Sequence, residues 1–363
     1  MDPAHAILSV SIREADIPLL GPFVISRGSV EVVQVAFVEV TLARGARGFG
    51  EIAPFAALTG ETRERSTAVA RNLARILRGR SALDWRALAA ELREAAPDEP
   101  AARAGLECAV VDAWCRAQGM PLWALWGGAD VRERETDVSL PIAPLDETLA
   151  HAARWHAQGF RVFKLKVGAD GDLARARGVA AAHPDAALVL DANQAWSETE
   201  AVAFVRELGA LKSRVRLLEQ PVAREDLDAM AALRRSGGVA VAADEAVFTR
   251  ADARRVIERR AADVINLKIM KSGLAETLAI AELARASGVG LMVGGMVETR
   301  LAMSFSYAIA LGLGGVAHID LDTPLFLAED PVVGGYAYAG PRMTVWREGG
   351  VGATPRAPGR GAT

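Results

Sequence analysis

Eight short apolar runs, separated by longer segments of helical period, dominate the sequence from about Thr136 onward. The runs are VSLPI, RVFKLKVG, AALVLD, VRLLE, VAVAAD, DVINLK, GLMVGG and VAHID, and from the second onward they recur every 24–28 residues or so. One strand, one helix and two short loops occupy such a length. The pattern predicts a parallel eight-stranded (β/α) barrel. An open doubly wound sheet is disfavoured because the chain has no glycine-rich nucleotide loop.

Different patterns flank these repeats. AILSVSIREADIPL and EVVQVAFVEVTLA alternate apolar and polar residues, and residues 62–118 are rich in Ala, Leu, Arg and Glu at helical spacing. The sequence therefore predicts an α+β unit over residues 1–128 and a barrel over residues 129–322. A C-terminal segment over residues 323–363 is expected to return to the first unit, with its last ~10 residues mobile.

The composition and charge indicate which partners and which cellular location to expect. The 363 residues carry a net charge of −3, and no block is rich in Lys and Arg, so we expect no nucleic-acid or membrane partner. Cys108 and Cys115, the two cysteines, are predicted to share a buried helical face without a disulfide, and the chain reads as cytoplasmic. Glu298 and Arg300 interrupt the longest apolar stretch, which favours buried core over a membrane span.

Charged residues stand at the ends of the apolar runs, where a covered barrel strand should be almost wholly apolar. Five successive runs carry them at or near their C-terminal ends: Lys164 and Lys166, Asp191, Glu219, Asp244 and Lys268. The intervals from Lys166 are 25, 28, 25 and 24 residues, one strand and helix each. Because a buried unpaired charge is costly, these residues are expected to form one site at the barrel rim.

The residue types indicate the chemistry. Asp191, Glu219 and Asp244 supply only oxygen ligands, which favours Mg²⁺. Lys166 and Lys268 would face each other across the barrel mouth, an arrangement that suits proton removal from one face of a carbon and return to the other. Lys164, on the same strand face as Lys166, would lower the pKa of its neighbour toward the ~7–8 useful to a base. A cation on a substrate carboxylate would stabilise the enediolate formed when the adjacent proton leaves.

The motifs FKLKVG, DANQAW, LLEQPV, AADEA and INLKIMKSG resemble those of the mandelate racemase/muconate lactonizing branch of the enolase superfamily. The resemblance covers essentially the whole chain and implies a (β/α)7β barrel with an α+β capping domain completed by the C-terminal segment. It also implies Lys166 and Lys268 as acid/base residues and Asp191, Glu219 and Asp244 as Mg²⁺ ligands. One departure is Leu274 after Lys271-Ser272-Gly273, where the family often has a second glycine.

Within that family the sequence is similar to the dipeptide epimerases, which carry an Asp-x-Asp pair at the end of the eighth strand, here Asp320 and Asp322. Two carboxylates there could bind the free ammonium of a dipeptide. The resemblance implies an isomerase that inverts the C-terminal α-carbon of an L,L-dipeptide through two lysines, and we expect a homo-oligomer. Arg27 could contact an acidic substrate side chain. Met296 and Glu298 are expected to line the pocket, and Glu298 could equally favour a cationic substrate side chain.

Two other functions remain open on the sequence alone. An o-succinylbenzoate synthase, an N-succinylamino acid racemase or a muconate cycloisomerase-like enzyme would use the same metal and lysines, although Asp320 and Asp322 would repel an anionic succinyl group. A sugar dehydratase is disfavoured because none of the five histidines ends the sixth or seventh run. A non-catalytic scaffold would have no use for two desolvated lysines.

Overall fold

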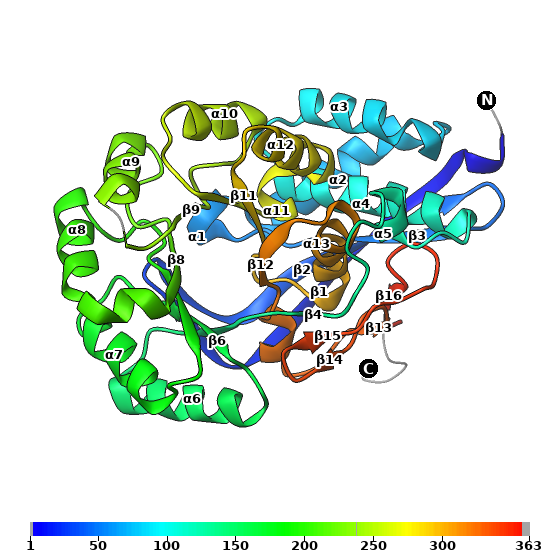
Figure 1. Ribbon diagram of the computed structural model, residues 1–363. Helices are drawn as coiled ribbons and strands as arrows, with labels where there is room; N and C mark the ends of the chain where they lie inside the picture. Colours follow the sequence, from blue (N-terminus) through cyan, green and yellow to red (C-terminus); the bar gives the residue numbers. More distant parts are fainter. Residues whose placement is uncertain (1–2, 237, 358–363) are drawn as a thin grey trace.

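The computed structural model describes residues 3–236 and 238–357, which form an α+β unit, a barrel and a C-terminal segment (Figure 1). The first unit contains a three-stranded antiparallel sheet of β1 (Ile7–Ile25), β2 (Gly28–Leu42) and β3 (Arg47–Ile52). Its helices are α1 (Ala56–Thr59), α2 (Arg63–Leu77), α3 (Trp85–Ala95), α4 (Pro100–Ala117) and α5 (Leu122–Leu125). Strands followed by helices are what the alternating and helical patterns predicted.

The second part is an eight-stranded parallel sheet curled into a barrel. Its strands are β5 (Val138–Leu140), β6 (Val162–Lys166), β7 (Ala187–Asp191), β8 (Val215–Glu219), β9 (Val241–Ala243), β10 (Val264–Leu267), β11 (Gly290–Gly294) and β12 (Val316–Asp320), paired in sequence order. The backbone N–H of Asp137 donates to the carbonyl of Ile319 at 3.0 Å and joins the first strand to the last. Each predicted apolar run contains one of these strands.

Seven helices connect the barrel strands and cover their outer face (Figure 1). They are α6 (Leu145–Ala157), α7 (Asp172–Ala182), α8 (Glu198–Glu207), α9 (Leu227–Ser236), α10 (Arg250–Glu258), α12 (Leu274–Ala286) and α13 (Arg300–Leu313). The short helix α11 (Ile269–Ser272) precedes α12. In the described part of the chain, β12 is followed by a short 3-10 helix (Thr323–Phe326) and by no α-helix, so the predicted (β/α)7β architecture is confirmed.

The first unit is packed tightly against itself through glycines. A Cβ on Gly48 would lie 2.0 Å from the backbone N of Ala113, and one on Gly50 would lie 2.1 Å from the carbonyl O of Gly105. Strand β3 therefore approaches α4 backbone to backbone, and side chains larger than hydrogen are excluded there. Helix α4 is buried on almost every side, and Cys108 and Cys115 are free thiols within it, as predicted.

Carboxylates of the first unit cap two barrel helices. Glu51 of β3 is fully buried and accepts from the backbone N–H groups of Thr299 at 2.9 Å and Ala302 at 3.2 Å, at the start of α13. Glu107 of α4 accepts from the N–H of Ala275 at 2.9 Å, at the start of α12. A helix N-terminus leaves N–H groups without intrahelical acceptors, so these contacts satisfy groups that the barrel leaves free.

The C-terminal segment packs on both parts. Its strands are β13 (Val332–Gly334), β14 (Tyr338–Ala339), β15 (Arg342–Met343) and β16 (Ala353–Pro355), and β15 pairs with β4 (Arg134–Glu135). Asp112 of α4 accepts from the N–H of Val351, while the Tyr307 hydroxyl of α13 donates to the Met343 carbonyl. Residues 358–363 of the tail predicted to be mobile lie outside the described residues. No helix in the described ranges has the length and apolar character needed to cross a membrane.

Candidate active site

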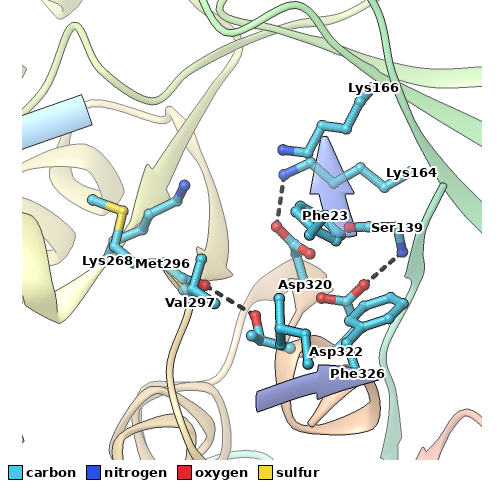
Figure 2. Close-up of a pocket in the computed structure, with 13 residues that line it drawn as sticks. Phe23, Ser139, Lys164, Lys166, Lys268, Met296, Val297, Asp320, Asp322 and Phe326 are labelled. Atoms are coloured by element: carbon cyan, nitrogen blue, oxygen red, sulfur yellow. Dashed lines mark hydrogen bonds and ion pairs between the residues drawn. The ribbon is translucent and has the colours of Figure 1, made fainter. Parts of the chain in front are cut away.

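The lysines enter one cavity from different strands. Lys164 and Lys166 are alternate residues of β6, so both side chains point to the barrel interior. Lys268 directly follows β10, which lies four strands away in the sheet order. Figure 2 shows Lys268 on the opposite side of the cavity from Lys164 and Lys166. All three lysines are buried. Buried charged groups are stable only when they are paired with opposite charges.

The predicted metal-ligating carboxylates stand on the three strands between the lysines. Asp191 ends β7, Glu219 ends β8, and Asp244 follows β9. The parallel register pairs Lys166 with Asp191 and Asp191 with Glu219, so these side chains lie side by side at the same height. None of the three carboxylates is more than 1% exposed.

The lysines and carboxylates form one ion-pair network. The Lys164 ammonium lies 2.6 Å from an Asp320 oxygen, 2.9 Å from Glu219 and 3.0 Å from Asp191. Lys166 lies 2.6 Å from the same Asp191 oxygen. Burial alone would lower the pKa of Lys164, but Asp191, Asp320 and Glu219 outweigh it and raise that pKa well above its usual range. Lys164 is therefore a fixed cation at the centre of the site.

Two residues that the sequence analysis did not single out hold these carboxylates in place. The Lys271 ammonium donates to Asp244 at its side chain (2.7 Å) and its carbonyl (2.6 Å). The Asn266 amide donates to Glu219 Oε1 at 2.7 Å. Lys268 adds a 2.6 Å ion pair to the other Asp244 oxygen. Because Asn266 lies inside an apolar run, its polar side chain was the signal that could have revealed it.

The carboxylate set fits a hard divalent cation by its chemistry. Glu219 Oε2 and Asp244 Oδ2 are buried, and each forms an ion pair with a lysine ammonium, Lys164 at 2.9 Å and Lys268 at 2.6 Å, without a well-directed hydrogen bond. Burial and the neighbouring Asp191 charge raise the pKa of Glu219 to about 7. A bound cation would offset this repulsion between the two carboxylates. The ligand oxygens of Asp191, Glu219 and Asp244 do not all lie within 4.8 Å of one another, because their side chains turn toward lysines.

The other end of the cavity is acidic. Asp320 ends β12, and Asp322 accepts a hydrogen bond from the backbone N–H of Ser139 (Figure 2). Burial and the adjacent Asp320 raise the pKa of Asp322 to about 7. Asp137, which the sequence analysis did not propose, brings a third carboxylate within 4.8 Å of these two. Asp137 directly precedes the first apolar run, and this position of a charged residue is the sequence signal that was available.

Apolar side chains form the remaining wall of the cavity. They are Leu19, Phe23, Met296, Val297 and Phe326. The first two come from β1, whose hairpin with β2 lies against the barrel mouth. Ser26 near its tip donates to the Ala192 carbonyl, and Val24 accepts from the N–H of Ile142.

The three predicted specificity residues lie in different places. Met296 lines the cavity. Arg27 is exposed at the tip of the β1–β2 hairpin and lines a separate surface depression. Glu298 is 1% exposed and turns back to accept from the Met296 N–H at 2.6 Å, and burial raises its pKa to about 8. The structure thus brings Met296 to the lysines, whereas Arg27 and Glu298 are not among the residues that line the cavity.

Comparison with known proteins gives matches over nearly the whole chain. Residues 7–127 match the family model of the mandelate racemase / muconate lactonizing enzyme N-terminal domain, and residues 147–361 match that of the enolase C-terminal domain-like family. An aromatic dipeptide epimerase of Herpetosiphon aurantiacus is 42% identical, with 92% of this chain and 94% of that protein covered. The L-Ala-D/L-Glu epimerase of Bacillus subtilis is 32% identical, with 95% and 96% covered.

Solved structures agree with these matches. A mandelate racemase/muconate lactonizing protein from Herpetosiphon aurantiacus superposes with a TM-score of 0.94 at 40% identity, covering 98% of this chain and 99% of that one. The dipeptide epimerase of Enterococcus faecalis, complexed with Mg and L-Leu-L-Tyr, superposes with a TM-score of 0.93 at 29% identity, covering 96% and 99%.

Proposed function

The chain belongs to the mandelate racemase / muconate lactonizing enzyme family of the enolase superfamily, and we propose that it is a magnesium-dependent dipeptide epimerase for substrates with an apolar C-terminal side chain. Its relatives are named epimerases, and the chain is an isomerase like them. The observation that carries the proposal is one cavity with lysines on opposite sides and two carboxylates at one end.

The two lysines supply the proton transfers. An α-carbon held between Lys166 and Lys268 would lose its proton to one amine and receive a proton on the opposite face from the other. Each lysine is ion-paired to a carboxylate at 2.6 Å, which fixes the position of its nitrogen. Removal of water from this buried site strengthens the electrostatic interactions of the reacting groups.

Asp191, Glu219 and Asp244 would hold the magnesium ion. The bound cation would supply electrostatic stabilisation to the substrate carboxylate as negative charge develops on it. These carboxylates also orient the lysines, because Asp191 contacts Lys166 and Asp244 contacts Lys268. Asn266 and Lys271 fix the carboxylates in turn.

The substrate class follows from the two other parts of the cavity. Asp320 and Asp322 offer negative charge to the free ammonium of a dipeptide, and they would repel the succinyl carboxylate of an N-succinylamino acid. The wall of Leu19, Phe23 and Val297 offers no charged partner to the C-terminal side chain. Relatives named as aromatic and hydrophobic dipeptide epimerases are consistent with this assignment.

A deuterium-exchange screen tests the proposal. Purified enzyme is incubated in D₂O with Mg²⁺ and a library of L,L-dipeptides, and α-deuterium uptake and the L,D product are measured by mass spectrometry and chiral chromatography. We expect L-Ala-L-Phe and L-Ala-L-Leu to be inverted faster than L-Ala-L-Glu and L-Ala-L-Lys. Inversion of no dipeptide would refute the activity, whereas a preference for L-Ala-L-Glu would refute only the apolar assignment.

A further inference from the structure

Asp137 is a buried carboxyl group beside the amino-end carboxylates, and the reaction described above does not use it. It lies just before β5, the residue is 5% exposed, and one of its oxygens, Oδ1, has no hydrogen-bond partner. Its carboxyl oxygens come within 4.8 Å of those of Asp320 and Asp322. Three carboxyl groups packed this closely away from water cannot all be ionised.

The partners of the three groups show which one keeps a proton. Asp320 is bonded to the Lys164 ammonium at 2.6 Å, so it is the ionised member. Asp322 accepts the backbone N–H of Ser139. Asp137 faces Asp320, Asp322 and the more distant Lys164, and it has no cation of its own. Asp137 and Asp320 have carboxyl oxygens within 4.8 Å of each other, and because carboxylate oxygens only accept hydrogen bonds, a hydrogen bond between the two requires a proton on one of them.

The backbone around Asp137 makes it a rigid support. Its N–H donates to the Ile319 carbonyl at 3.0 Å, and the preceding Thr136 hydroxyl accepts from the Leu321 N–H at 2.9 Å. The closure of the barrel between its first and last strands therefore coincides with the amino end of the cavity. Ser139 of β5 donates its backbone N–H to Asp322, and the side chain of Asp137, just before β5, lies within 4.8 Å of both carboxylates.

We propose that Asp137 is a positioning residue for the substrate's amino group: it retains a proton, donates it to Asp320, and so fixes the carboxylate that receives the ammonium. This inference rests on the proposed epimerase function. Burial, together with the charges of Asp320 and Asp322, raises the pKa of Asp137 well above its usual range, which agrees with a retained proton. Asp137 does not line the cavity and need not touch the substrate.

Substitutions of similar size separate hydrogen bonding from packing. Asp137→Asn keeps a donor toward Asp320, and Asp137→Leu fills the same space without one. Asp137→Ala provides a second donor-free variant should the leucine variant not fold. Each is assayed with L-Ala-L-Phe and with N-propionyl-L-Phe, which lacks only the amino group. The measured quantity is the ratio of kcat/KM for the two compounds.

Loss of the donor should reduce that ratio about tenfold, mainly through a higher KM for the dipeptide, because hydrogen bonds to charged groups are among the stronger ones. Asp137→Asn should retain the wild-type ratio. Equal losses on both compounds would overturn the inference, since a purely structural defect does not sense the amino group. An asparagine variant as impaired as the leucine or alanine variant would overturn the proton-donor role. Failure of the proposed function itself appears separately, as wild-type enzyme that inverts no dipeptide.

Discussion

Removing one lysine should separate proton exchange from inversion. Lys166 and Lys268 lie on opposite sides of the cavity, so each would reach only one face of the α-carbon. In Lys268→Ala, the remaining lysine can still remove and return the proton on its own face. The variant should therefore exchange the α-proton of one epimer with solvent while failing to convert it to the other.

The magnitude follows from the loss of one acid/base group. Such a group contributes about 10²–10⁴-fold to the rate, or about 3–5 kcal/mol in the barrel's buried site. Lys268 is 4% exposed, so bulk water does not readily replace it. Inversion should fall by at least ~10²-fold, whereas exchange of the epimer served by Lys166 should fall far less. The ratio of exchange to inversion should thus exceed about 100.

The assay follows α-deuterium by NMR, starting separately from the L,L and L,D epimers. Lys166→Ala is the matched variant and should exchange the epimer that Lys268→Ala does not. Because Lys268 is ion-paired to Asp244, Mg²⁺ binding is measured by calorimetry for each variant, so that a lost cation is not mistaken for a lost base. Exchange of the same epimer by both variants, or inversion at the wild-type rate by either, would refute the two-face arrangement.

Three further predictions concern the metal, the pH dependence and the packing. Glu219→Gln should weaken Mg²⁺ binding more than about tenfold by calorimetry and lower activity in parallel; unchanged binding would exclude Glu219 as a ligand. The pKa of Glu298 is raised from 4.5 to about 8, so the folded state keeps a proton that the unfolded chain releases, and stability falls as pH rises between these values. Between about pH 5 and pH 8, the Tm of the Glu298→Gln variant should therefore fall less with rising pH than the Tm of the wild type. An identical dependence of Tm on pH in the two proteins would contradict this prediction. Gly50→Ala, whose Cβ would meet the Gly105 carbonyl at 2.1 Å, should cost about 1–3 kcal/mol or more in urea unfolding, while Gly21→Ala, with no neighbouring atom within 4 Å, should cost little; equal effects would contradict the packing argument.

Much of the barrel and of its rim could be predicted because burial makes charge conspicuous. Each strand is covered on both sides, so a lysine or carboxylate at the end of an apolar run is costly unless it serves a site. Lys166, Asp191 and Glu219 end neighbouring strands in register, as their regular spacing indicated. Asp320, which ends β12, was indicated instead by the resemblance to the dipeptide epimerases.

What could not be predicted depends on contacts between distant segments. Asp137 precedes its strand instead of ending it, and its proximity to Asp320 exists only because the barrel closes there. Lys164 was expected to act mainly on Lys166, but it pairs with carboxylates from three strands. Arg27 and Glu298 gave opposite indications of substrate charge, and loop conformation places both outside the cavity lining.

Glu51 and Glu107 of the N-terminal unit accept hydrogen bonds from the first turns of two barrel helices, which limits how domains could be exchanged between this protein and its relatives. A chimaera that exchanged the N-terminal unit alone would lose these acceptors unless the donor sequence offered carboxylates at the same two points. The N–H groups of Thr299 and Ala275 would then be left unsatisfied inside a new interface. One of those caps precedes α13, directly after the Met296–Val297 turn. A mismatched swap would therefore alter substrate choice along with stability, so the two units are expected to have diverged as a pair.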